Sequence, residues 1–155
     1  MVQNPVRAVF WHCTHEKYVS LGSARMTLPL LWWRGQDDDR GGITLKHAAI
    51  DYRLSFVTSD LRLIPLRPEV TIRDDDAAEK AQGLWTKTLN GKGGQDFVPI
   101  VIAAPAGKIF CTRDRTIPEF SSFLCFSYKT RWKMWFGPGS IQEESEAESI
   151  LGSLK

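Results

Sequence analysis

The sequence is poor in the features that mark disulfide-rich, membrane-spanning or metal-dependent proteins. It contains three cysteines, an odd number, at spacings that match neither a disulfide framework nor a zinc motif. No stretch approaches the about 18 consecutive apolar residues of a transmembrane helix, because proline interrupts the two most apolar segments, 28–33 and 97–106. We therefore expect reduced thiols and no membrane-spanning segment.

The first residues also lack a secretory pattern. Residues 1–7 are polar and contain no apolar run of the kind found in signal peptides. Reduced cysteines are typical of the cytosol and the nucleus. The sequence therefore favours one of these two compartments over secretion.

Recognisable catalytic motifs are missing as well. The densest group of reactive side chains is His12, Cys13 and His15. On a strand the two histidines point to opposite faces, so a zinc site needs a turn after Cys13 and distant ligands such as His47 or Cys111. We expect a non-enzymatic protein without cofactor or metal. A small metal-dependent enzyme built around His12, Cys13 and His15 is the alternative.

The chain does contain enough apolar material for one folded domain. With 155 residues, 43% hydrophobic and 25% charged, it has the composition of a globular protein. We predict a single α+β domain over residues 1–139, built mainly from antiparallel strands. An acidic C-terminal tail or short helix follows over residues 140–155, where Ser140 and Glu143 have the spacing of a capping box.

The main helix is predicted over residues 76–90. Three aspartates at 74–76 supply an N-cap and negative charge at the positive end of the helix dipole. Apolar residues then recur at helical spacing, and the Asn-Gly pair at 90–91 ends the pattern. This helix is expected to pack on the sheet.

The remaining apolar segments are typical of strands. In the segment 43–58 the alternation changes phase, which we interpret as a β-bulge near residues 48–50. The nearly continuous apolar run at 97–103 predicts a strand buried on both faces. The other expected strands cover residues 6–13, 26–34 and 108–112.

The strongest pattern lies in residues 124–136 (LCFSYKTRWKMWF). Even-numbered positions are mostly apolar, whereas odd-numbered positions include Lys129, Arg131, Lys133 and finally Trp135. Because successive side chains of a strand alternate between faces, this period predicts one long strand with an apolar face and a cationic face.

The charge distribution indicates a positive surface. Residues 108–133 contain six basic residues against two acidic ones, while the chain from Gly137 onward has four glutamates and one lysine. Such a field attracts phosphate or anionic lipid, although an ordinary solvated sheet face gives the same pattern. The residues that we assign to an anion-binding surface are Lys108, Arg113, Arg115, Lys129, Arg131, Lys133 and Trp135.

A second surface is predicted where four large apolar residues follow one another. Leu30, Leu31, Trp32 and Trp33 are consecutive, so on an extended chain they face both ways and part of the segment is exposed. We assign these residues to self-association or membrane contact.

Basic and aromatic residues also interleave within residues 128–135, a pattern that stacks bases in proteins that bind single-stranded nucleic acid. On one continuous strand, however, Tyr128 and Trp132 lie on the apolar face. Only Trp135 then remains beside the cations. The pattern therefore favours a membrane or protein surface over base stacking.

The order of elements between residues 51 and 136 resembles the globular domain of rhabdovirus matrix proteins, particularly the vesiculovirus type. The features that carry the resemblance are a strand at 51–58, a helix with Trp85, the Gly91–Lys92 loop, Phe97, a strand at 100–103, the turn at 106–108 and residues 117–120 (IPEF).

This resemblance implies a viral structural protein that self-associates, bridges an anionic membrane and the nucleocapsid, and drives budding. Its expected partners are further copies of itself, the anionic membrane surface, viral nucleoprotein or RNA, and host proteins. Its expected location is the host cytoplasm or nucleus and the inner face of the membrane or virion.

Two alternatives accompany this leading hypothesis. A nucleic-acid-binding or host-protein-binding module can use the same basic segment, residues 124–136. In addition, the acidic residues after Ser140 can fold back onto the basic strip and gate it.

Overall fold

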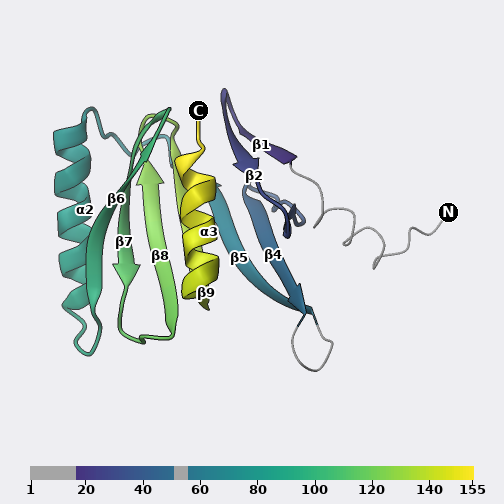
Figure 1. Cartoon of the computed structure of the whole chain (residues 1–155). Coiled ribbons are helices and arrows are strands. Elements are labelled where there is room, and N and C mark those ends of the chain that lie inside the picture. Colours follow the sequence, from purple (N-terminus) through teal and green to yellow (C-terminus); the bar gives the residue numbers. More distant parts are fainter. Residues whose placement is uncertain (1–16, 51–55) are drawn as a thin grey trace.

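The structure is a computed structural model that describes residues 17–50 and 56–155 (Figure 1). The predicted strand at 6–13 and the group His12, Cys13 and His15 lie outside these residues. The elements, in chain order, are β1 (Lys17–Leu21), β2 (Ala24–Leu28), β3 (Trp32–Arg34), β4 (Ile43–Ile50), β5 (Phe56–Pro65), α2 (Asp75–Asn90), β6 (Phe97–Ala104), β7 (Gly107–Asp114), β8 (Phe120–Ser127), β9 (Trp132–Ser140) and α3 (Ile141–Gly152).

Within these residues the strands form two antiparallel sheets. The larger has seven strands in the order β3-β4-β5-β9-β8-β7-β6, and β1 pairs with β2 as a separate hairpin. The N-terminal strands β3 to β5 and the C-terminal meander β6 to β9 meet where β5 pairs with β9. The predicted α+β class is confirmed.

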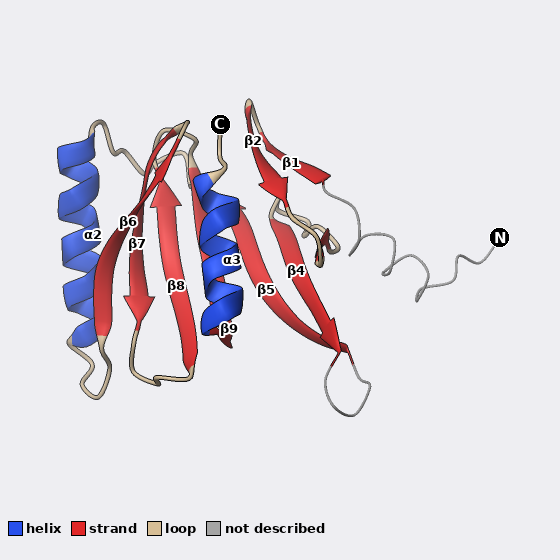
Figure 2. Ribbon diagram, viewed as in Figure 1, coloured by secondary structure: helices blue, strands red, loops and turns tan. Residues whose placement is uncertain are grey.

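One face of the large sheet carries the main hydrophobic core. Its fully buried side chains include Leu45, Leu61, Met134 and Phe136, and they pack with the β1–β2 hairpin and with α3. Figure 2 shows α3 lying in front of β9 and beside β8. Each large aliphatic side chain buried in this way stabilises the fold by roughly 1.5–3 kcal/mol.

The predicted short C-terminal helix is therefore part of this core. Ala147, Ile150 and Leu151 of α3 and the following Leu154 are all buried. The helix begins at the predicted capping box, where the Ser140 hydroxyl accepts a hydrogen bond from the Glu143 amide at 3.2 Å. Residues 140–155 thus belong to the domain and do not form a separate tail.

The main helix α2 covers part of the opposite face. It starts at Asp75, one residue before the predicted start, and the first of the three aspartates is the N-cap: the Asp74 carboxylate accepts from the Ala77 amide at 2.8 Å. Its buried side packs on Phe110 and Phe126, whereas Cys111, next to Phe110, lies in the main core. Because neighbouring residues of a strand point to opposite faces, α2 and α3 lie on opposite sides of the sheet.

Polar contacts fix the position of α2. The Gln82 side-chain amide donates to the carbonyl oxygens of Ile100 and Cys111 at 2.7 and 2.6 Å. The Tyr128 hydroxyl donates to the Asp75 carboxylate, and this hydrogen bond, assisted by burial, raises the pKa of Tyr128 to about 12. Neither helix of the described chain is long and apolar enough to cross a membrane.

The predicted long strand at 124–136 is wrong, because these residues form a hairpin. β8 ends at Ser127 and β9 begins at Trp132, and Phe126 pairs with Lys133. Phe126 and Lys133 therefore lie on the same face of the sheet, although one is an even and the other an odd position. The alternation of residues along the sequence does not show that the chain reverses between them. The expected uniform cationic face does not exist.

Two other expected strands are also divided. The phase change within residues 43–58 is not a bulge: Ile50 pairs with Phe56, so the chain reverses between β4 and β5. The expected strand at 26–34 separates at Pro29 into β2 and β3, which belong to different sheets. Proline has no backbone N–H to donate, so it occurs only at the ends or edges of strands and at bulges.

The apolar strand β6 is an edge strand and is not buried on both faces. It stands at the end of the strand order, and Val98 and Val101 are 39% and 51% exposed. A continuous apolar run does not distinguish an edge strand from a central one.

The expectation of reduced thiols is wrong for two of the three cysteines. Cys111 on β7 and Cys125 on β8 are directly paired in the sheet and form a disulfide. Both are fully buried. Their pairing follows from the register of two strands and not from any cysteine spacing in the sequence.

We predict that this disulfide persists in the purified protein and stabilises it. In the chain-entropy model, closing a loop of this length contributes about 3 kcal/mol. A Cys111→Ala/Cys125→Ala variant should therefore melt about 6–12 °C lower than the native protein. Peptide mapping without reductant should show the two cysteines linked, and free thiols at both positions would contradict the structure.

Candidate binding face of the sheet

Of the helices among residues 17–50 and 56–155, neither covers the half of the sheet face beside α2. α2 contacts β6 and β7, while α3 lies on the other face. Register places Lys46 opposite Trp33, Arg62 opposite Trp135, and Lys133 opposite Phe126. We call the surface formed by Trp33, Lys46, Arg62, Lys133 and Trp135 the open face.

Cations and indoles are interleaved on the open face. The Arg62 guanidinium carbon lies 5.3 Å from the ring centroid of Trp135, and the Lys46 ammonium lies 6.0 Å from that of Trp33. Such cation–π contacts hold the rings and the charged groups side by side. Both tryptophans are half-buried, so their positions are restrained while part of each ring stays accessible.

The open face has an excess of positive charge. Lys46 lies 3.7 Å from the Asp60 carboxylate, which balances one cation. Arg62 and Lys133 are exposed, and no ion pair to either is found among residues 17–50 and 56–155. Within the described part of the chain, two cations without an ion pair therefore flank Trp135 and can meet an anionic partner.

The predicted anion-binding residues do not share one surface. Lys133 and Trp135 lie on the open face. Lys108 and Lys129 lie at the end of the sheet where β6 turns into β7 and β8 into β9. Arg131 belongs to the second of these turns, and its guanidinium donates to the Val70 carbonyl at 2.7 Å.

Arg113 is largely buried against α3, whereas Arg115 stays exposed at the edge of this contact. The Arg113 guanidinium contacts the carboxylates of Glu144 and Glu148, and Arg115 lies 3.9 Å from Glu144. Burial lowers the pKa of Arg113 and the charge of Glu144 opposes that shift. Arg113 therefore anchors the C-terminal helix, which corrects its assignment to an exposed basic surface.

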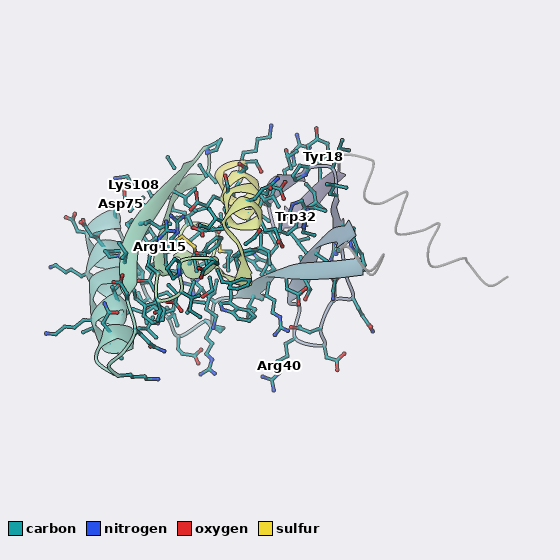
Figure 3. All side chains as sticks on the ribbon, turned by 60° about the horizontal axis from the view of Figure 1, so that its bottom comes forward. Tyr18, Trp32, Arg40, Asp75, Lys108 and Arg115 are labelled. Carbon is teal, nitrogen blue, oxygen red and sulfur yellow. A yellow bond between two sulfur atoms is a disulfide. The ribbon has the colours of Figure 1, made fainter. Side chains whose placement is uncertain are left out.

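The segment of large apolar residues is divided between three environments. Trp32 is fully buried; its indole nitrogen donates to Glu146 of α3 at 3.2 Å, and it lies close to this helix in Figure 3. Trp33 lies on the open face. Leu30 and Leu31 are 51% and 46% exposed, so the expected exposure holds for these two residues.

The described residues contain no group of three histidine, cysteine or acidic side chains able to hold a metal. His47, the distant ligand considered for a zinc site, is buried against α3. Its two ring nitrogens lie 3.7 Å from Glu143 and 3.5 Å from Glu146. It therefore links β4 to the C-terminal helix.

The sequence alone does not identify Trp33, Lys46 and Arg62 as parts of the open face. Polar residues do alternate with buried leucines in β4 and β5, as in Thr44, Lys46 and Arg62. This alternation marks an exposed face on each strand. It does not reveal that β5 lies beside β9, a pairing between distant parts of the chain.

Comparison with protein-family models and with curated protein sequences gives no match for this chain. The resemblance to rhabdovirus matrix proteins therefore stays a prediction.

We predict that the Arg113–Glu144 contact is required for docking of α3. Their side chains are 12% and 4% exposed, and removing one partner of such a buried pair costs about 3–5 kcal/mol; because Arg113 keeps its contact with Glu148, we expect a loss at the lower end of this range. Glu144→Ala should lower the free energy of unfolding by this amount in urea titrations. Ser145→Ala, at the exposed neighbouring position, should change it by less than about 0.5 kcal/mol; equal effects would contradict the anchoring role.

Proposed function

We propose that the protein is a non-enzymatic nucleic-acid-binding protein whose open face binds single-stranded RNA or DNA. The observation that supports this proposal is the placement of Trp33 and Trp135 on one sheet face with Lys46, Arg62 and Lys133. It removes the objection raised by the sequence, in which only one indole lay beside the cations. This proposal corresponds to the nucleic-acid-binding alternative of the sequence analysis. The binding residues now come from several strands of the sheet instead of the single segment 124–136.

The combination of groups matches the requirements of single-strand binding. Indole rings stack on unpaired bases of any sequence, and cations between the rings neutralise backbone phosphates. Sheet-based RNA-binding modules stack two or three bases on aromatic side chains in this way. Trp33 on β3 and Trp135 on β9 are three strands apart, or about 14 Å, which is a suitable span for a short extended segment.

The position of α2 favours a flexible strand over a flat membrane. This helix packs on the same face of the sheet, beside the open face, and a helix with its side chains is about 10–12 Å across. A planar bilayer would meet α2 before it reached Arg62 or Trp135. A single strand can instead lie along the sheet next to the helix.

We predict that Arg62→Ala and Trp135→Ala weaken binding of a fluorescent single-stranded oligonucleotide. Loss of one stacking indole costs about 1–3 kcal/mol, or roughly tenfold or more in affinity. Because Asp60 balances Lys46, two cations count, and the logarithm of the binding constant should fall with the logarithm of salt at a slope of roughly −1.4. Fluorescence anisotropy measures both quantities.

Arg73→Ala is the matched control, because Arg73 is exposed and lies outside the open face. It removes the same charge as Arg62→Ala and should leave affinity nearly unchanged. Equal losses of affinity in the two variants would show that the oligonucleotide responds only to net charge. That result would contradict the proposal.

The matrix-type role is a second proposal, supported by the exposure of Leu30 and Leu31 beside the open face. In that role the exposed leucines contact a neighbouring copy or an anionic membrane, and the open face contacts viral RNA or nucleoprotein. The protein would then bridge membrane and nucleocapsid without catalysing a reaction.

We predict that Leu31→Asn tests this second role with little effect on the fold. Leu31 has φ 72°, a left-handed conformation that asparagine adopts more readily than leucine. If the leucines insert into lipid, this variant should lose most of its co-sedimentation with phosphatidylserine vesicles, since burial of one leucine is worth roughly 1.5–3 kcal/mol. Unchanged sedimentation, or equal sedimentation with neutral vesicles, would contradict the membrane role.

A further inference from the structure

We propose that the cavity between the β1–β2, β6–β7 and β8–β9 turns is a binding site for a phosphomonoester, separate from the open face. The cavity has a volume of about 490 Å³. Ser23 and Ala106 from the first two turns and Lys129, Thr130 and Arg131 from the third line it, together with Lys155. This site goes beyond nucleic-acid binding and does not depend on it.

The charge of the cavity is suited to an anion. Lys129, Arg131 and Lys155 are three of its nine lining residues, and no aspartate or glutamate lies among those nine. A carboxylate on Lys155, if the chain ends there, still leaves an excess of positive charge. The Ser23 hydroxyl adds a neutral hydrogen-bond donor, whereas the Thr130 hydroxyl donates to the Ser127 carbonyl at 3.5 Å within the turn. A doubly charged phosphate takes up several such donors, and charge-assisted hydrogen bonds to it are stronger than neutral ones.

Lys129 is held at the edge of this cavity by the neighbouring turn. A Cβ atom at Gly107 would lie 2.7 Å from Cδ and 3.4 Å from Nζ of Lys129, so the absence of a side chain there lets the lysine pack against the turn. The backbone of Gly107, with φ 140°, is itself in a conformation that favours glycine. The lysine stem thus loses less freedom on binding than a fully solvated one would.

Arg131 and Lys155 are likewise fixed in place. Arg131 has φ 66°, and its guanidinium donates to the Val70 and Arg67 carbonyls at 2.7 and 3.0 Å. The backbone of Lys155 exchanges two hydrogen bonds with Arg25, at 2.8 and 3.0 Å. The walls of the cavity are therefore formed before any ligand arrives.

The size of the cavity indicates a ligand larger than inorganic phosphate. Pockets for small molecules and cofactors typically measure about 300–1,000 Å³, and this one lies within that range. A phosphorylated sugar or polyol fits both the volume and the mixture of cations and hydroxyls. The same chemistry occurs in free sugar phosphates and in phosphorylated lipid headgroups.

Isothermal titration calorimetry with a soluble inositol trisphosphate tests the site on the full chain. We expect saturable binding that Lys129→Ala weakens by about ten- to a hundredfold, as expected for loss of a charge-assisted hydrogen bond. Lys92→Ala, which removes an exposed lysine from another loop, should bind like the native protein. Ser23→Ala should weaken binding without any change of charge. No saturable heat, or equal losses for Lys92→Ala and Lys129→Ala, would overturn the proposal.

Two further experiments follow. One distinguishes a lipid headgroup from a free phosphate as the ligand, and the other distinguishes the phosphate site from the open face. Stronger sedimentation with phosphatidylinositol bisphosphate vesicles than with phosphatidylserine vesicles of equal charge would assign the site to a lipid headgroup, whereas binding only to the soluble ligand would assign it to a free phosphate. Trp135→Ala should keep its affinity for inositol trisphosphate while it loses oligonucleotide. Loss of both ligands in this folded variant would contradict a separate phosphate site.

Discussion

The pairing of β5 with β9 is the contact on which the open face depends. Trp33, Lys46 and Arg62 come from the first half of the chain, and Lys133 and Trp135 from its end. Only the register between these two strands brings the groups onto one surface. The same pairing aligns Leu61 with Phe136 and Leu63 with Met134 in the main core, so the hydrophobic effect that stabilises the sheet also positions the exposed side chains.

The distribution of charge follows from where the helices lie. The acidic helix α3 packs on the core face, where its glutamates meet Arg113, Arg115 and His47. It therefore lies on the opposite side of the sheet from the open face, and the idea that the acidic segment gates that surface is not supported by its position. The compensated basic residues hold the fold together, while Arg62 and Lys133 stay exposed.

Local signals in the sequence predicted the parts of the fold that local interactions determine. The sequence places the cap of α2 among the aspartates at 74–76 and that of α3 at Ser140, and the structure has caps at Asp74 and Ser140; each cap involves residues only three positions apart. The hairpin within 124–136 and the Cys111–Cys125 disulfide were missed. Both depend on which strands become neighbours. The alternation of apolar and polar residues continues through the turn, although even-numbered residues of β8 and of β9 point to opposite faces of the sheet.

The tryptophan indole N–H resonances test the central claim most directly, because the indoles mark both faces of the sheet. In a titration of the labelled protein with an unlabelled single-stranded oligonucleotide, the account predicts saturable shifts for Trp33 and Trp135. Trp32, which is fully buried against α3, should not shift. Shifts at Trp32 without shifts at Trp33 and Trp135, or no shifts at saturating oligonucleotide, would contradict a nucleic-acid-binding open face.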